Sequence, residues 1–218
     1  MALSKRLQRI VDQIQGSCLA DIGCDHGYVV IEALKQNKVK KAYACDVAPL
    51  PLENAQRNIE AAHLQNRAQC LLMNGIESLP EDVDCIVMAG MGGSLMIDIL
   101  ERGKVRVGTR FYLSCHKDTP LLRKYLLQHG FSIEKEWIIQ EDRHFYPLIQ
   151  CVYTRKPCLK VSEKELYYGV SLEFDKDAGS YLENEKKKWT KIFQQMPPSK
   201  RKEAQIRLQY INELLDRF

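Results

Sequence analysis

Asp21-Ile-Gly-Cys-Asp-His-Gly27 follows the apolar run Cys18-Leu-Ala20 and precedes Tyr28-Val-Val-Ile31. An apolar run, a glycine-containing turn and a second apolar segment with helical spacing are typical of a strand–turn–helix unit. Glycines allow such a turn to pass close to a ligand, and the helix that follows directs free backbone amides toward the same place. The stretch therefore predicts the first βα turn of an α/β domain, with a ligand site beside it.

The two aspartates of this turn distinguish between classes of ligand. A dinucleotide-binding fingerprint reads Gly-x-Gly-x-x-Gly, whereas this turn keeps only Gly23 and Gly27 and adds Asp21 and Asp25. Carboxylates repel a pyrophosphate but attract the ammonium group of a methionine moiety. The turn therefore favours S-adenosylmethionine over a nicotinamide dinucleotide.

Strand-like and helical segments alternate on both sides of the turn. We predict strands over 18–22, 42–46, 68–73, 83–89 and 110–115, and helices over 4–14 (with Ser4 as N-cap), 28–36, 52–62, 94–102 and 119–128. This alternation predicts a parallel sheet with helices on both faces. Two further strand-like runs, 131–140 and 146–154, have no helix between them and predict an antiparallel pair at the sheet edge. The pattern is that of a doubly wound, Rossmann-like α/β sheet of the class I methyltransferase type.

The composition changes after residue 154. The net charge is +4, and the whole excess lies in residues 155–218. Two amphipathic segments there, 183–193 and 200–215, are separated by Met196-Pro-Pro-Ser199, and proline ends a helix. We therefore predict two domains: a Rossmann-like domain of residues 1–156 and a small helical, coiled-coil-like domain of residues 157–218.

The overall composition excludes several classes of protein. Hydrophobic residues make up 45% and charged residues 28%, which are globular values. No apolar run reaches the roughly eighteen residues of a membrane span, and the first residues do not resemble a signal peptide. None of the eight cysteines forms a Cys-x-x-Cys pair, so we expect reduced, structural thiols and no metal site. These features predict a cytoplasmic protein without membrane contact.

Acidic, amide and small residues follow the next predicted strands. Asp46 ends the second strand, where a carboxylate can bind both ribose hydroxyls; it can also cap the helix before Pro49, and the two roles are compatible. Asn74-Gly75 ends the third strand and either flanks an adenine or forms an ordinary turn. Ala89-Gly-Met-Gly-Gly93 ends the fourth, where cofactor and acceptor are expected to meet. These positions extend the predicted site along one edge of the sheet.

In this order the motifs resemble those of the bacterial tRNA (adenine-22-N1)-methyltransferase family, TrmK. The resemblance rests on the first turn through Tyr28, on the later motifs from Asp46 to Gly93, and on the opening Leu3-Ser-Lys-Arg-Leu7; it spans about residues 3–154. It implies S-adenosylmethionine as methyl donor and a D-arm adenine of tRNA as acceptor. The charged C-terminal helices resemble the coiled-coil appendage of that family.

Motifs and resemblance together give a set of expected site residues. For the cofactor they are Asp21, Gly23, Asp25, Gly27, Asp46, Val47, Asn74, Gly75, Ala89, Gly90, Met91 and Gly92. At the reaction site we expect Asp25 to hold the methionine end, Tyr28 to shape the transfer site or stack on the base, and His26 to orient one of them. The alternatives are packing of Tyr28 on the sheet and a supporting hydrogen bond from His26.

Contacts with the acceptor are expected from basic clusters at both ends of the chain and from the end of the fifth strand. The expected residues are Lys5, Arg6, Arg9, Ser114, Cys115, His116, Lys186, Lys187 and Lys188, with Lys200-Arg-Lys202 as a further cluster. The basic clusters can equally be solvated helix faces. Ser114-Cys-His116 replaces a Gln-Pro-Asn of the family, which leaves open a small-molecule or protein acceptor, or a non-catalytic protein that binds S-adenosylmethionine or RNA. We expect tRNA as partner and a monomer.

Overall fold

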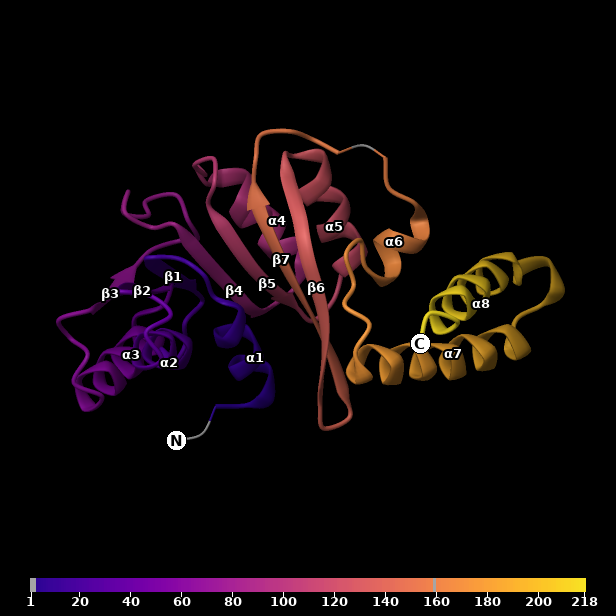
Figure 1. The fold of residues 1–218 in the computed structure, drawn as a ribbon, viewed down its shortest axis with the longest axis horizontal. Coiled ribbons are helices and arrows are strands. Elements are labelled where there is room, and N and C mark those ends of the chain that lie inside the picture. The colour runs from indigo at the N-terminus through magenta and orange to yellow at the C-terminus, as the bar shows by residue number, and fades with distance from the viewer. Residues whose placement is uncertain (1–2, 159) are drawn as a thin grey trace.

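The computed structural model describes residues 3–158 and 160–218, so Met1, Ala2 and Leu159 of the two predicted domains lie outside the described residues. A seven-stranded sheet in the order β3-β2-β1-β4-β5-β7-β6 forms its centre (Figure 1). The strands are β1 (Cys18–Ile22), β2 (Lys41–Asp46), β3 (Ala68–Leu72), β4 (Cys85–Met91), β5 (Arg110–Cys115), β6 (Phe131–Glu141) and β7 (His144–Tyr153). The first five strands are parallel and β7 pairs antiparallel with both β5 and β6, which confirms the predicted sheet.

The strand order reverses between β1 and β4. The chain runs from β1 outward to β2 and β3, then returns to the other side of β1 to form β4. The connections that leave the carboxyl ends of β1 and β4 therefore diverge to opposite faces of the sheet, and ligands of doubly wound folds bind in the crevice between them. The β6–β7 hairpin projects past the same edge, because Leu113 near the end of β5 already pairs with Ile149, five residues into β7.

Helices cover both faces of the sheet (Figure 1). The cluster on one face joins α1 (Lys5–Gln13), α2 (Tyr28–Lys35) and α3 (Pro49–Ala61) to β-strand residues such as Leu19. The cluster on the other face joins α4 (Gly93–Arg102) and α5 (Thr119–Gln128) to Cys18 and Ala20. Because successive side chains of a strand point to opposite faces, all five residues of β1 are buried.

The C-terminal part is helical, with α6 (Glu163–Tyr168), α7 (Lys176–Gln195), a 3-10 turn η1 (Pro198–Lys200) and α8 (Lys202–Leu215). The antiparallel helices α7 and α8 pack through Leu182, Ile211 and Leu214, with Trp189 partly buried beside them. The predicted helical hairpin is therefore present, although α7 begins seven residues earlier than the predicted segment. Helix α6, which lies after the predicted boundary, packs against α5, which lies before it. The contacts therefore do not separate two domains at residue 156, and that boundary stays a prediction.

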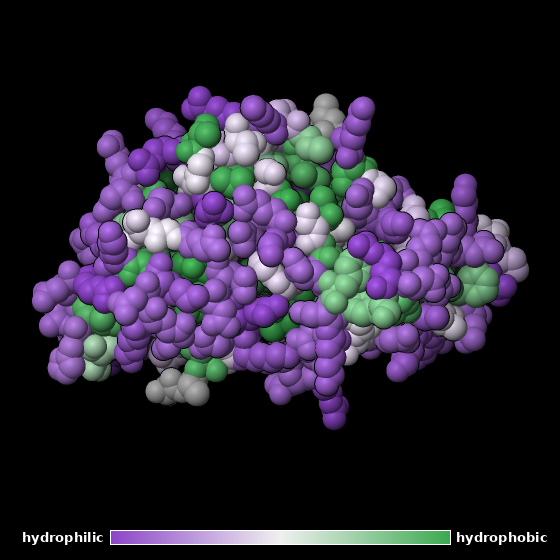
Figure 2. All heavy atoms as spheres, viewed as in Figure 1, coloured by the Kyte–Doolittle hydropathy of each residue, from purple (hydrophilic) through white to green (hydrophobic). Residues whose placement is uncertain are grey.

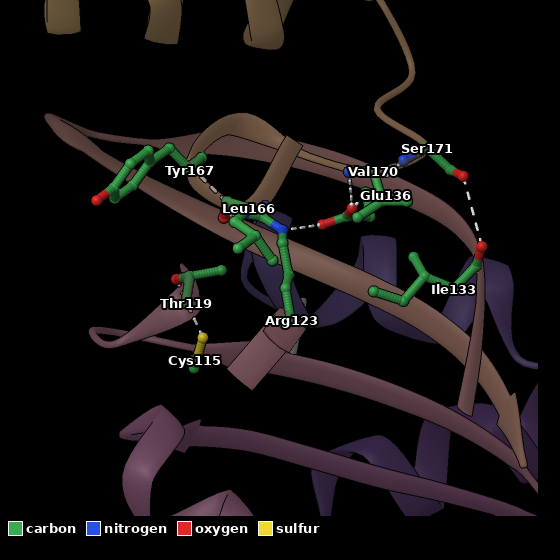
Figure 3. Close-up of polar contacts among 9 residues, drawn as sticks. All are labelled: Cys115, Thr119, Arg123, Ile133, Glu136, Leu166, Tyr167, Val170 and Ser171. Atoms are coloured by element: carbon green, nitrogen blue, oxygen red, sulfur yellow. Dashed lines mark hydrogen bonds and ion pairs between the residues drawn. The ribbon is translucent and has the colours of Figure 1, made fainter. Parts of the chain in front are cut away.

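A buried ion pair connects these helices to the sheet (Figure 3). Arg123 on α5 donates from Nε to Glu136 Oε2 on β6 at 2.7 Å, and both side chains are at most 2% exposed. The same guanidinium donates to the carbonyls of Leu166 and Tyr167 at the end of α6. We call this group of contacts the Arg123–Glu136 junction.

Seven of the eight cysteines are buried or half-buried, as their apolar surroundings predict, whereas Cys158 is exposed. On the face drawn in Figure 2, hydrophilic side chains cover most of the surface and hydrophobic ones form small, scattered groups. Among residues 3–158 and 160–218, no helix combines the length and the apolar composition that a membrane crossing requires.

Candidate active site at the sheet switch point

A cavity of about 220 Å³ opens between the carboxyl ends of β1 and β4. Its wall is formed by α1, the first βα turn, the start of α2 and the end of β4; the lining residues are Arg6, Leu7, Asp21, Gly23, Cys24, Asp25, His26, Tyr28, Val29, Ala89 and Gly90. The predicted turn therefore lines a cavity at the switch point. Leu7, Cys24 and Val29 were not predicted as site residues; Cys24 lies within the predicted turn, whereas the apolar context of Leu7 and Val29 is that of core residues.

The first turn is held by its own backbone. The amides of Gly23 and Cys24 both donate to the carbonyl of Cys45 at the end of β2, at 2.8 and 3.1 Å. Gly27 has a φ of 69°, and a Cβ there would lie 3.1 Å from the Cβ of Ala55 on α3. Asp25 also has a positive φ, 47°, which non-glycine residues seldom adopt outside functional or strained sites. The turn is thus compact because α3 approaches it closely.

Asp21 is a buried carboxylate at the inner end of the cavity. It is 4% exposed, and burial together with the negative charge of Asp46 raises its pKa to about 7. A buried carboxylate without a neighbouring cation is unstable in its charged form, and a cation placed beside it lowers its pKa again. The position is therefore suited to a positively charged ligand group.

Asp46 holds the turn after β2 and keeps one oxygen for other contacts. Its Oδ1 accepts a hydrogen bond from the amide of Ala48 at 3.0 Å, and Ala48 itself is the N-cap of α3. Val47 beside it is 68% exposed, which is unusual for a large apolar side chain. The side chain of Asp46 therefore does not cap α3, which corrects the predicted capping role, and it does not line the cavity; its contact with a ribose stays a prediction.

Asn74 and Gly75 lie farther along the same edge and do not line the cavity. Asn74 is exposed and its Oδ1 accepts from Arg102 at 3.4 Å, while the amide of Met73 donates to the carbonyl of Asp46. Gly75 has a φ of 73°, and a Cβ there would lie 3.0 Å from the side chain of Ile99. The pair is a tight turn beside Asp46, so its contact with an adenine stays a prediction.

The end of β4 differs from its prediction. The strand does not stop at Ala89 but continues to Met91, because a register shift at Gly90 lets Met91 pair with Cys115. Gly90 has a φ of 83°, which favours glycine, and the methyl carbon of Met91 lies 3.1 Å from the place of a Cβ on Gly23. Met91 thus lies across the turn, and Gly92 follows as the N-cap of α4.

Asp25, His26 and Tyr28 form a group at the mouth of the cavity. The carboxylate of Asp25 is 69% exposed and lies 3.4 Å from Nε2 of His26. The rings of His26 and Tyr28 are stacked, with centroids 5.2 Å apart and planes 20° from parallel. Asn58 on α3 donates to the carbonyl of His26. The arrangement presents an aromatic surface and a carboxylate to whatever enters the cavity.

Only one residue of the predicted group at the end of β5 reaches the surface. Ser114 and Cys115 are fully buried, and the thiol of Cys115 lies 3.2 Å from Oγ1 of Thr119. His116 is exposed, and its ring lies edge-on to the ring of Tyr146, with the two ring centroids 5.7 Å apart. A Cβ on Gly90 would lie 3.9 Å from Nε2 of His116, so this imidazole is close to the cavity. Of these three residues, only His116 is placed to contact an acceptor, and that contact stays a prediction.

The predicted basic residues of α1 point in two directions. Lys5 and Arg9 pair with Asp177 and Asp175 at the start of α7, at 2.6 and 3.5 Å, whereas Arg6 lines the cavity. A larger hollow of about 560 Å³ lies along Lys5 and Arg9, and both of these ion pairs are part of its lining. On α7, Lys188 pairs with Glu185 at 2.9 Å; Lys187 is exposed and Lys186 half-buried.

Comparisons with known proteins agree with this arrangement. Residues 3–149 match a family model described as a methyltransferase domain. The tRNA (adenine(22)-N(1))-methyltransferase of Bacillus subtilis strain 168 is 29% identical over an alignment that covers 100% of this chain and 94% of that relative. The structure of M. capricolum TrmK in complex with S-adenosyl-homocysteine is 30% identical, covers 99% of both chains and gives a TM-score of 0.84. A Streptococcus pneumoniae protein solved with S-adenosyl-L-methionine is 29% identical, with a TM-score of 0.83 over 98% of this chain and all of that one.

Proposed function

This chain belongs to the TrmK family of methyltransferases, and from that premise we propose that it transfers a methyl group from S-adenosylmethionine to N1 of adenine 22 in the D-arm of tRNA. The observation that carries the proposal is the cavity at the switch point, which is lined by the buried carboxylate of Asp21, whose pKa is raised to about 7 by burial and by the charge of Asp46. The similarity of the Bacillus subtilis relative, which extends over the whole chain, supports the choice of acceptor.

The residues present fit S-adenosylmethionine. Asp21 and Asp25 accept hydrogen bonds from its ammonium group. The second carboxylate oxygen of Asp46, Oδ2, accepts hydrogen bonds from the ribose hydroxyls, while Oδ1 accepts from the amide of Ala48. Val47 and Asn74 lie at the edge where the adenine of the cofactor would extend, and the glycine at position 90 leaves room for the methyl donor. When bound, S-adenosylmethionine supplies an electrophilic methyl group at the mouth of the cavity.

The chain contributes positioning more than proton transfer. N1 of adenine carries a lone pair in the ring plane and no proton, so the base must be held with N1 in line with the methyl–sulfur bond. The stacked rings of His26 and Tyr28 offer a surface on which the base can lie. The methylated base is cationic, and the exposed carboxylate of Asp25 next to this surface stabilises the positive charge that develops on it.

The acceptor base is part of a folded RNA and must be presented to the cavity. Unstacking such a base costs a few kcal/mol, which phosphate contacts elsewhere can offset. We propose that the lysines at 186–188 on α7, within the predicted helical domain of residues 157–218, supply part of these contacts. We further propose that the protein works as a monomer in the cytoplasm.

The test is methylation of two tRNA transcripts that differ at one base. One carries adenine 22 and the other guanine at that position; both are incubated with the protein and labelled S-adenosylmethionine, digested and analysed as nucleosides. We expect label in 1-methyladenosine from the first transcript and none from the second. Equal labelling of both transcripts, or label in another nucleoside, would contradict the proposed acceptor.

A further inference from the structure

Arg6 is an arginine whose polar end is unused. It extends from the first turn of α1 into the wall of the switch-point cavity, and its Nη1 is buried without a hydrogen-bond partner among the described residues. Its backbone amide donates to Glu141 on β6 at 3.0 Å, and its guanidinium carbon lies 5.2 Å from the centre of the Tyr146 ring. These contacts fix where the guanidinium lies but leave a buried donor free, and a buried donor without an acceptor is costly.

The neighbouring cations of α1 behave differently. Lys5 and Arg9 lie one turn apart on the same helix face, and both pair with aspartates at the start of α7. Arg6 is rotated away from that face, toward the β6–β7 hairpin and the cavity. Among the residues that line this cavity in the described part of the chain, Arg6 is the only lysine or arginine.

We propose that Arg6 binds the carboxylate of the methionine moiety of S-adenosylmethionine, an inference that rests on the cofactor proposed above. The methionine end of this cofactor is a zwitterion, and Asp21 and Asp25 match only its ammonium group. A carboxylate entering beside two aspartates is repelled unless a cation accompanies it. The planar guanidinium offers paired donors that suit a carboxylate, and stacking on Tyr146 keeps it oriented.

The proposal gives Arg6 a different partner from the one expected on sequence grounds, a tRNA phosphate. Phosphate and carboxylate are both anionic acceptors, but Nη1 is buried at the cavity wall, whereas a polynucleotide backbone follows the outer surface. Arg6, Asp21 and Asp25 together complement both charges of an α-amino acid. The site therefore selects for the intact amino-acid end of the cofactor.

The test compares two ligands that differ by one carboxylate. S-adenosylhomocysteine and its decarboxylated analogue, the adenosine thioether with a 3-aminopropyl chain, are titrated calorimetrically into the wild type, Arg6→Met and Lys38→Met. Arg6→Met removes the charge but keeps an apolar chain against Tyr146. Lys38 is the charge control, because its ammonium donates to the Asp12 carbonyl at the far end of α1, outside the cavity.

We expect Arg6→Met to weaken S-adenosylhomocysteine binding by about 10- to 100-fold, the range for a charge-assisted hydrogen bond, and to leave binding of the decarboxylated analogue within about twofold. Lys38→Met should leave both affinities unchanged. Arg6→Lys should restore part of the preference for the carboxylate, because it restores the charge without the planar fork.

Two results would overturn the proposal while leaving the cofactor in place. Equal losses for both ligands would mean that Arg6 only shapes the cavity. Unchanged affinity for both, with a raised KM for tRNA, would assign Arg6 to a phosphate. Absence of S-adenosylhomocysteine binding by the folded wild type would instead remove the proposed function together with this inference.

Discussion

Two regions of the molecule place an arginine near carboxylates, a fully buried one at the junction and a half-buried one at the cavity, and they satisfy these charges in opposite ways. At the Arg123–Glu136 junction, the Arg123 guanidinium donates to Glu136 and to two carbonyls of α6, while Glu136 Oε1 accepts from the amides of Val170 and Ser171 (Figure 3). At the switch-point cavity, Arg6 keeps a free donor and burial raises the pKa of Asp21. Buried polar groups that find partners in the chain stabilise a fold, and those that do not are available to a ligand.

The junction also continues into the backbone. The amide of Glu136 donates to the carbonyl of Ser171, and the amide of Glu173 donates to the carbonyl of Glu136. These bonds attach the segment between α6 and α7 to the edge of β6, where Glu136 and Leu172 form a parallel bridge. We interpret the junction as the connection that sets where α7 and its lysines stand relative to the sheet.

The largest effect is expected from Arg123→Met. It leaves Glu136 buried without its counter-ion, and breaking a buried pair in this way costs about 3–5 kcal/mol of unfolding free energy. Denaturant unfolding followed by circular dichroism measures the loss. Lys135→Met is the matched control: Lys135 is the neighbouring residue on β6, its pair with Glu173 is exposed, and its loss should cost no more than about 1 kcal/mol. Equal costs for the two variants would contradict a structural role for the junction.

A smaller effect, on ligand affinity, is expected from Asp21→Asn. Without the charge that faces the ligand's ammonium, affinity for S-adenosylhomocysteine should fall by about 10- to 100-fold. Stability should not fall, because the variant removes a buried charge. A variant that unfolds more easily but binds normally would place Asp21 in the fold and outside the ligand site.

Asp21 also predicts a pH dependence. Its pKa is about 7 in the folded chain against an ordinary value of 3.8, so the free folded protein holds a proton that the unfolded chain has lost between about pH 4 and 7. Stability of the free protein should therefore fall as the pH rises through that window. Affinity for S-adenosylhomocysteine should rise over pH 6 to 8 as Asp21 ionises. Both trends should flatten in Asp21→Asn; an unchanged slope in that variant would assign the titration to another group.

The smallest effect is expected at the mouth of the cavity. Tyr28→Ala removes one ring of the stacked pair and should lower kcat/KM for tRNA by about tenfold, since one base–aromatic contact contributes on the order of 1–3 kcal/mol. Tyr28→Phe keeps the ring and should stay close to the wild type. Steady-state methylation assays at saturating cofactor measure both. A similar loss in the two variants would indicate that the hydroxyl matters more than stacking.

How far the sequence predicts each region follows from the range of the interactions involved. The first βα turn, the parallel strands and the antiparallel pair at the sheet edge are local patterns or follow from βα alternation, and they are confirmed in the fold. The extension of β4 to Met91 was missed because it depends on pairing with Cys115, twenty-four residues away. The short helix α6 was missed as well, since its apolar residues are divided between two clusters: Leu166 packs on the sheet side, and Tyr167 and Tyr168 pack with α7 and α8.

The two arginines show the same limit. Arg123 sits in an amphipathic segment where nothing marks it as buried, and its partners come from β6 and α6. Arg6 belongs to a basic cluster whose spacing predicts an exposed helix face. In the fold its guanidinium instead packs over the ring of Tyr146, 140 residues later in the chain, and lines the cavity. Long-range packing decides which cation of a cluster is exposed, and sequence spacing does not encode it.

The contrast between the two regions is tested most directly by calorimetric titration of S-adenosylhomocysteine into the wild type, Asp21→Asn and Arg123→Met, at a temperature where all three are folded. The account predicts wild-type affinity for Arg123→Met despite its lowered stability, and an affinity about 10- to 100-fold weaker for Asp21→Asn despite its intact fold. Loss of affinity in Arg123→Met together with normal binding by Asp21→Asn would contradict it.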